Sequence, residues 1–220
     1  KREIEQLKGE EATSLILEIN RHRIQIDNVI SQMMEMAADD SQLLTATIAK
    51  LAAEREFPEG GESFLNSAVT TSELSSATLT QAVTALVKSG QTAALRPTFF
   101  AISKMSGKQA KRDQQRALQS VVKSNLLQNQ LEVVLQECQN ADSSIGYWAT
   151  AAILGVVQEK NISPETRKKA ELSIDKMWSE PGQRIRLIKT AANTQNHFLD
   201  DRLLELTNRP EPDSIEAVRH

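Results

Sequence analysis

Apolar residues recur along most of the chain at intervals of three and four, the spacing that places them on one face of an α-helix. In residues 126–139 five of them stand at offsets 0, 4, 7, 8 and 11: Leu127, Leu131, Val134, Leu135 and Cys138. Residues 143–158 carry a broader stripe, so we expect this helix to be the most buried. No segment alternates convincingly with the period of a strand. The pattern predicts an all-α protein of about thirteen helices, each of roughly 10–17 residues.

Residues that start and stop helices stand where this periodicity is interrupted. Ser163 precedes Pro164, which predicts a helix beginning there, and Glu180-Pro181 marks another boundary. Three pairs with glycine are placed where helices should end: Ser89-Gly90, Ser106-Gly107 and Gly60-Gly61. Residues 57–62 are the one longer connection, expected to be an extended loop between repeats rather than a hinge.

Helix-turn-helix units recur at intervals of roughly 35–50 residues. In three turns an apolar helix ends, an aspartate follows and a helix rich in small residues begins, at Asp40, Asp142 and Asp213. This pattern resembles the HEAT repeat, in which the turn aspartate caps the second helix. Pro97, inside an apolar run, resembles the proline that kinks the first helix of a HEAT unit.

The resemblance covers residues 24–220 and implies an α-solenoid of stacked antiparallel helix pairs, similar to HEAT and armadillo arrays. The aspartate turns are 102 and 71 residues apart (142 minus 40, 213 minus 142), and the turns after Met105 and Trp178 lack the aspartate. We therefore expect irregular repeats in one domain spanning 1–220. The start at Lys1 and the helix-like residues 214–220 predict a fragment of a longer chain.

Composition narrows the class of partner. The formal net charge is −3, from 26 basic and 29 acidic residues, so no global attraction to nucleic acid or anionic membranes is expected. A hydrophobic content of 40% suffices for a core, and no apolar run reaches the roughly 18–20 residues of a membrane helix. A soluble protein with no membrane partner is expected, and its compartment stays open because a single cysteine does not fix it.

No residues predict catalysis, a cofactor or a metal. The histidines, His22, His197 and His220, stand apart from Cys138 and from one another, and no HExxH or CxxC motif occurs. A lone cysteine on an apolar helix face is expected to be a small buried hydrophobe, and it excludes covalent haem. The adjacent acids Asp39-Asp40 and Asp200-Asp201 diverge by about 100° on a helix, so we interpret them as caps.

Four residues form the predicted interaction surface. Lys104, Lys108 and Lys111 would share one side of a helix if one helix ran through them, which a helix end at Ser106-Gly107 would prevent. Such a ridge could bind phosphates, as the similar HEAT-like DNA glycosylases do, although a solvated face is the usual meaning of a basic run. Trp178, at a helix end, is the better candidate for partial exposure at a binding groove, although a core position is the more usual one even there. Trp148 is expected in the core.

The expected function is a non-catalytic helical-repeat scaffold, not an enzyme, that binds a protein partner or a neighbouring domain of its own chain. One alternative is a HEAT-like DNA-binding protein or DNA glycosylase that uses the basic ridge, although the charge balance disfavours nucleic acid. The other is a helical-repeat segment attached to a catalytic or c-type haem domain absent from this chain. Residues 163–219 resemble such segments of large bacterial secreted proteins.

Overall fold

The computed structural model describes residues 29–37, 40–54, 57–139 and 143–208. Of these residues 81% are helical and none lies in a strand, which confirms the all-α prediction. No helix in this part of the chain is long and apolar enough to cross a membrane.

The described ranges contain twelve α-helices and the short 3₁₀ helix η2, close to the predicted number. In chain order they are α3 (Val29–Met36), α4 (Ser41–Ala53), α5 (Gly61–Thr71), α6 (Ser76–Ser89), η2 (Thr92–Ala94), α7 (Leu95–Lys104), α8 (Ala110–Val122), α9 (Asn125–Asn129), α10 (Leu131–Glu137), α11 (Ser143–Gln158), α12 (Pro164–Ser179), α13 (Pro181–Thr194) and α14 (Asp200–Asn208).

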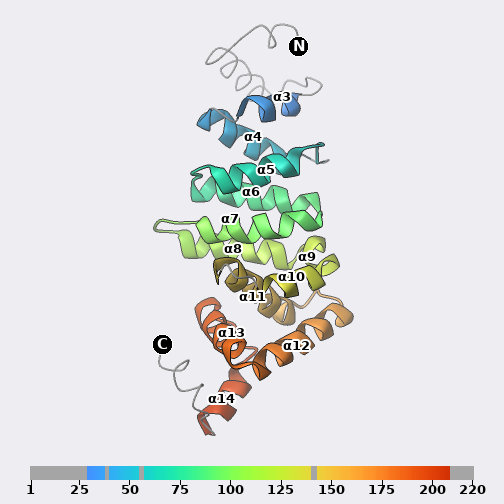
Figure 1. The fold of residues 1–220 in the computed structure, drawn as a ribbon, viewed down its shortest axis with the longest axis vertical. Helices are drawn as coiled ribbons and strands as arrows, with labels where there is room; N and C mark the ends of the chain where they lie inside the picture. Colours follow the sequence, from blue (N-terminus) through green and yellow to red (C-terminus); the bar gives the residue numbers. More distant parts are fainter. Residues whose placement is uncertain (1–28, 38–39, 55–56, 140–142, 209–220) are drawn as a thin grey trace.

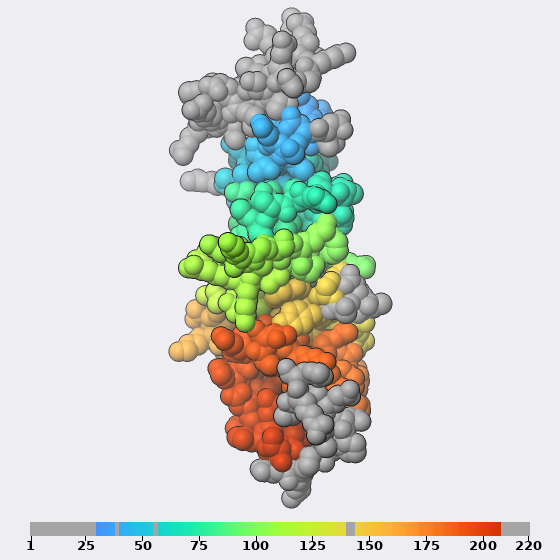
Figure 2. Space-filling model, turned by 90° about the vertical axis from the view of Figure 1, so that its left-hand side faces the viewer, coloured from blue at the N-terminus to red at the C-terminus, as the bar shows by residue number. Residues whose placement is uncertain are grey.

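The helices stack in chain order along the long axis of the molecule (Figure 1). Helices α4, α6, α8, α11 and α13 contact one another in succession and form one row. On the other side of the stack α5 contacts α7, and α10 contacts α12. The space-filling view shows the same elongated outline from the side (Figure 2).

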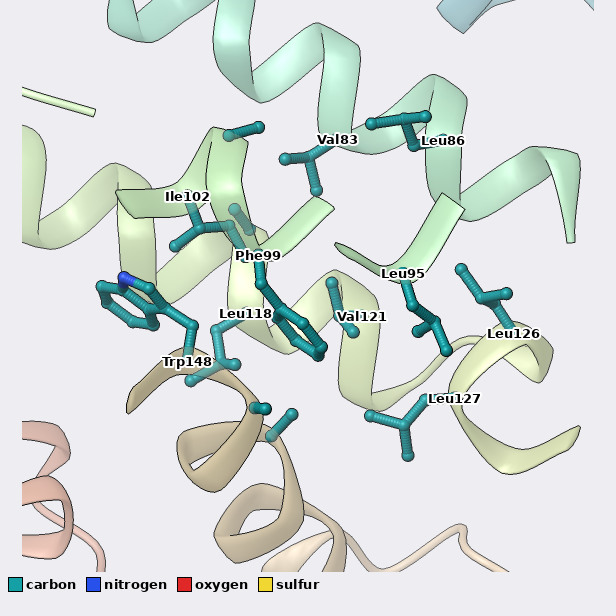
Figure 3. Close-up of a cluster of buried hydrophobic side chains, with 14 of the residues drawn as sticks. Val83, Leu86, Leu95, Phe99, Ile102, Leu118, Val121, Leu126, Leu127 and Trp148 are labelled. Atoms are coloured by element: carbon teal, nitrogen blue, oxygen red, sulfur yellow. The ribbon is translucent and has the colours of Figure 1, made fainter. Parts of the chain in front are cut away.

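The buried apolar side chains form a core that runs through the stack. Helix α11 contacts α7, α8, α10, α12 and α13, and it is buried along nearly its whole length. Its bounds, Ser143–Gln158, confirm the prediction made from the broad apolar stripe. Figure 3 shows how Phe99 of α7 meets Leu118 and Val121 of α8 above α11. Trp148 is buried at the edge of this cluster, as predicted.

Several predicted helix ends are confirmed by their caps. The Asp40 side chain accepts hydrogen bonds from the backbone N–H groups of Gln42 and Leu43, both at 2.9 Å, at the start of α4. The Ser163 hydroxyl accepts one from Thr166 N–H at 3.1 Å, and Pro164 begins α12. Gly90 ends α6 in the left-handed conformation. The other two aspartate turns, and Asp39, lie outside the described residues.

Two predicted boundaries are wrong. The single helix expected over 126–139 is divided at Gln130, whose N–H bonds to the carbonyls of Leu126 and Leu127. Both α9 and α10 bury apolar residues in the same core, so the helical spacing of apolar residues continues across the break. Gly60 and Gly61 begin α5 instead of ending a helix, because Gly60 takes the left-handed N-cap position. A Cβ on Gly61 would lie 2.9 Å from the Phe57 ring, so this turn is closely packed rather than loose.

Pro97 does not kink a helix interior, contrary to the expectation from the HEAT resemblance. It is the third residue of α7, a helix that begins directly after η2. A proline in the first turn leaves the helix intact, because the N–H group that it lacks has no partner at a helix start. Pro97 therefore helps to begin α7.

Candidate functional site

A groove lies across three helices of one row, α8, α11 and α13. It consists of two adjoining hollows with volumes of about 410 and 340 Å³, both of which are lined by Gln115 and Thr194. The smaller hollow also takes Lys111, Tyr147 and Trp148, and the larger one Gly155 and Glu159. We call these two hollows together the amide groove.

The floor of the amide groove is one face of α11. Tyr147, Ala151, Gly155 and Gln158 are spaced four, four and three residues apart, so they lie along one side of the helix. The small side chains of Ala151 and Gly155 leave open the space that forms the hollow. A Cβ on Gly155 would lie 2.7 Å from a methyl carbon of Val122, so the glycine also permits the close approach of α8 to α11.

Side-chain amides dominate the walls. Five glutamines and two asparagines line the two hollows: Gln114, Gln115, Gln119, Gln158, Gln195, Asn193 and Asn196. Each amide carries both hydrogen-bond donors and acceptors. They are neutral at every accessible pH, so they recognise polar groups by hydrogen bonding and not by charge.

Two of the amides hold the walls in place. Gln114 Nε2 donates to the carbonyls of Ile102 and Met105, at 3.2 and 3.3 Å, and so ties α8 to the end of α7. The buried Asn196 donates through Nδ2 to the carbonyl of Leu154 at 2.8 Å, which fixes the end of α13 against α11. Gln119, Gln158, Gln195 and Asn193 are exposed and face the solvent side of the site.

The smaller hollow ends on an aromatic pair. The rings of Tyr147 and Trp148 meet edge to face, with centroids 4.9 Å apart and planes at 89°. The Tyr147 hydroxyl pairs with the Asn193 side chain. Burial raises the pKa of Tyr147, and the hydrogen bond to Asn193 opposes that rise only in part. The phenol is therefore neutral and serves as a fixed polar group at this end.

Helices α8 and α11 run in the same direction along the groove, and α13 meets it at its C-terminal end. The smaller hollow takes Lys111, Tyr147 and Asn193, whereas the larger takes the later residues Val122, Gln158 and Gln195. Lys111 lies in the first turn of α8 and is exposed. At the other end Glu159 lies 3.9 Å from Lys123, and its backbone carbonyl accepts from Arg167 at 2.6 Å. The carboxylate at that end thus has a cationic partner, whereas no carboxylate of the described residues lines the smaller hollow beside Lys111.

The structure separates the three lysines that the sequence grouped. Helix α7 ends at Lys104, and Gly107 turns the chain with a φ of 92° before α8 begins. Lys104 Nζ donates to the carbonyl of Val69 at 2.9 Å, at the end of α5, and lies 4.9 Å from the centre of the Phe100 ring. The condition for a ridge, one helix through Lys104, Lys108 and Lys111, is not met. Of the three, only Lys111 lines the amide groove.

Trp178 is half-buried at the end of α12, where it packs against the core, and it does not line the groove. The guanidinium groups of Arg184 and Arg202 lie 5.8 and 5.7 Å from its ring centre. Arg202 is also paired with Asp175 at 2.5 Å, and it reaches the ring of Phe198. This cluster joins α12 to α14, which gives Trp178 a structural role. Its role in binding stays a prediction.

The reactive side chains of Cys138 and His197 lie outside the amide groove. Cys138 is buried, which confirms the expectation of a small hydrophobe, and burial raises the pKa of its thiol to about 12. His197 Nδ1 lies 3.0 Å from Asp200 Oδ2 on the surface, beside the first turn of α14. Within the described ranges, no group of three or more His, Cys, Asp or Glu residues is arranged to hold a metal ion.

The amide groove was not predicted from the sequence, because charged and aromatic residues gave the patterns on which the predicted interaction surface was based. A signal was present in α8, where Gln114, Gln115 and Gln119 share a helix whose one acid is Asp113. The α11 and α13 residues that complete the site are remote in the chain, and no local pattern connects them.

Comparisons of the chain with protein families, with curated proteins and with solved structures found no match. The function is therefore inferred from the geometry of the groove.

Proposed function

We propose that this chain is a non-catalytic scaffold, a HEAT-like α-solenoid with irregular repeats, that binds an extended segment of a protein partner in the amide groove. The observation that carries the proposal is the set of amide side chains around a floor that Ala151 and Gly155 keep open. The solenoid is supported by the stacking of helices in chain order and by the common direction of α8 and α11.

An extended peptide matches the chemistry of the walls. Its backbone presents N–H and C=O groups along both edges, and an amide side chain can donate to one and accept from the other. Lys111 and Val122 are eleven residues apart on α8, which corresponds to about 16 Å, the length of about five extended residues. A segment of that size spans the groove, and its flanking residues extend beyond the two ends.

Binding of DNA receives less support from the same observations. Phosphate binding requires several free cations along one surface. The walls of the groove contain one lysine, and Lys104 already donates to α5.

The solenoid arrangement predicts an elongated particle in solution. A compact protein of this length has a radius of gyration of about 17 Å, and we expect small-angle scattering to give a clearly larger value with a rod-like distance distribution. A radius near 17 Å with a symmetric distribution would contradict the solenoid.

Removing exposed amides is expected to weaken peptide binding. We would select binders from a displayed library of random 12-residue peptides and measure their affinity by fluorescence anisotropy. The double substitution Gln119→Ala and Gln158→Ala should weaken binding of the selected peptides by about thirtyfold, because two hydrogen bonds of roughly 1 kcal/mol each are lost.

The matched control is Gln136→Ala with Gln139→Ala, which removes two exposed amides from α10 and its end, outside the groove. This control should bind as the parent does. The proposed function is wrong if the library yields no binder, or if both double variants affect binding equally.

A further inference from the structure

The smaller hollow of the amide groove is rich in hydrogen-bond donors. Lys111 brings an ammonium group with three donors, and Gln115 and Asn193 bring amide N–H₂ groups. Trp148 brings an indole N–H, a donor only, which forms no hydrogen bond with any described residue. Figure 3 shows the indole at the edge of the apolar cluster, with its nitrogen turned away from Leu118 and Phe99.

Little negative charge opposes these donors. Asp113 is the acid of α8, and it stands two residues from Lys111, about 200° around the helix, so it belongs to another side. Helix α13 contains no acid, and neither does α11. The exposed neighbours of Lys111 on α8 include Arg112, which adds to the positive charge at this end. In the helices that line the hollow, Lys111 therefore has no carboxylate partner.

Building on the proposed function, we infer that the smaller hollow binds a carboxylate of the partner segment. The Lys111 ammonium is the counter-charge, and the Trp148 indole N–H and the nearby amides donate to the carboxylate oxygens. A volume of about 340 Å³ accommodates such a group together with part of its residue. The aromatic faces of Tyr147 and Trp148 exclude water from one side, which strengthens the charge-assisted hydrogen bonds.

The carboxylate has two possible sources, an acidic side chain or the C-terminus of the partner. Three pools of eight-residue peptides separate them, each with neutral residues varied at the other positions. One pool has a central Glu and blocked ends, the second has a free C-terminal carboxylate and no acid, and the third has a central Gln and blocked ends. Binding of each fluorescent pool is measured by anisotropy at low and at moderate ionic strength.

One of the two carboxylate pools should bind about tenfold more tightly than the Gln pool, and salt should reduce this preference. Lys111→Gln should reduce the preference to less than about twofold, as expected when the charge-assisted bond is lost. Trp148→Phe keeps an aromatic ring but removes the N–H group, so it should reduce the preference for the carboxylate pool in part. The matched control is Lys168→Gln, which changes an exposed lysine of α12 outside the groove and should leave the preference intact.

The inference is overturned if all three pools bind equally. It is also overturned if Lys111→Gln, like the control Lys168→Gln, leaves the preference for the carboxylate pool unchanged. In that case amide-dependent binding of the selected peptides would still support the scaffold. If no pool binds and the library also gives no binder, the proposed function and the carboxylate site are both wrong.

Discussion

Replacing Phe99 with alanine is expected to lower the free energy of unfolding by about 3–5 kcal/mol, the range for large aromatic side chains removed from packed interiors. Phe99 is fully buried, and its ring lies among Leu95, Leu118 and Val121 (Figure 3). Helix α7 is held by α6, α8 and α11, so these neighbours cannot move inward together to fill the space. Urea unfolding followed by circular dichroism at 222 nm measures the loss.

The adjacent residue provides the matched control. Phe100 is only half-buried, at the surface beside Lys104, so Phe100→Ala removes the same atoms with less loss of packing. We expect Phe100→Ala to lower the free energy of unfolding clearly less than Phe99→Ala does. Equal losses of stability from the two variants would contradict the position of Phe99 in the core.

The thiol of Cys138 is expected to react with iodoacetamide about a thousandfold more slowly in the folded protein than in the urea-unfolded chain. Burial raises the pKa of the thiol from 9.0 to about 12, so the reactive thiolate becomes correspondingly rare near pH 8. Intact mass recorded over time gives both rates. An exposed thiol introduced by Ser120→Cys in a Cys138→Ala background is the control, and it should react at the unfolded rate.

The same pKa has a consequence for stability. Between about pH 9 and pH 12 the thiol ionises in the unfolded chain but stays protonated in the folded protein. The folded state then binds more protons, so its stability is complete below pH 9 and falls as the pH rises toward 12. Cys138→Ala should flatten this fall. Rapid native-state alkylation, or an unchanged pH profile in the alanine variant, would contradict the buried position.

The sequence predicted those elements whose signals are local. The apolar stripe of 143–158 gave the bounds of α11 because a helix covered on several sides needs apolar residues around most of its circumference. The start of α12 was predictable from Ser163 because a hydroxyl satisfies the free N–H groups of the first turn.

Other features depend on contacts between remote segments, and local patterns do not reveal them. The break at Gln130 keeps the same residues on the core side, so the apolar spacing passes through it. Gly60 begins a helix because Phe57 and Pro58 pack against Gly61, which single-residue preferences do not report. The amide groove requires α8, α11 and α13 to lie side by side, which only the stacking of the helices brings about.

The stacking in chain order also governs how this molecule folds and opens. The helix pairs in extensive contact are neighbours or near neighbours in the chain, so the native contacts form without closing long loops, a topology of low contact order that favours rapid folding. Protection of backbone amides against hydrogen exchange should then be graded, highest in α11 and lower toward α3 and α14. Partial opening would begin at the ends and would leave the groove helices α8 and α11 intact until late.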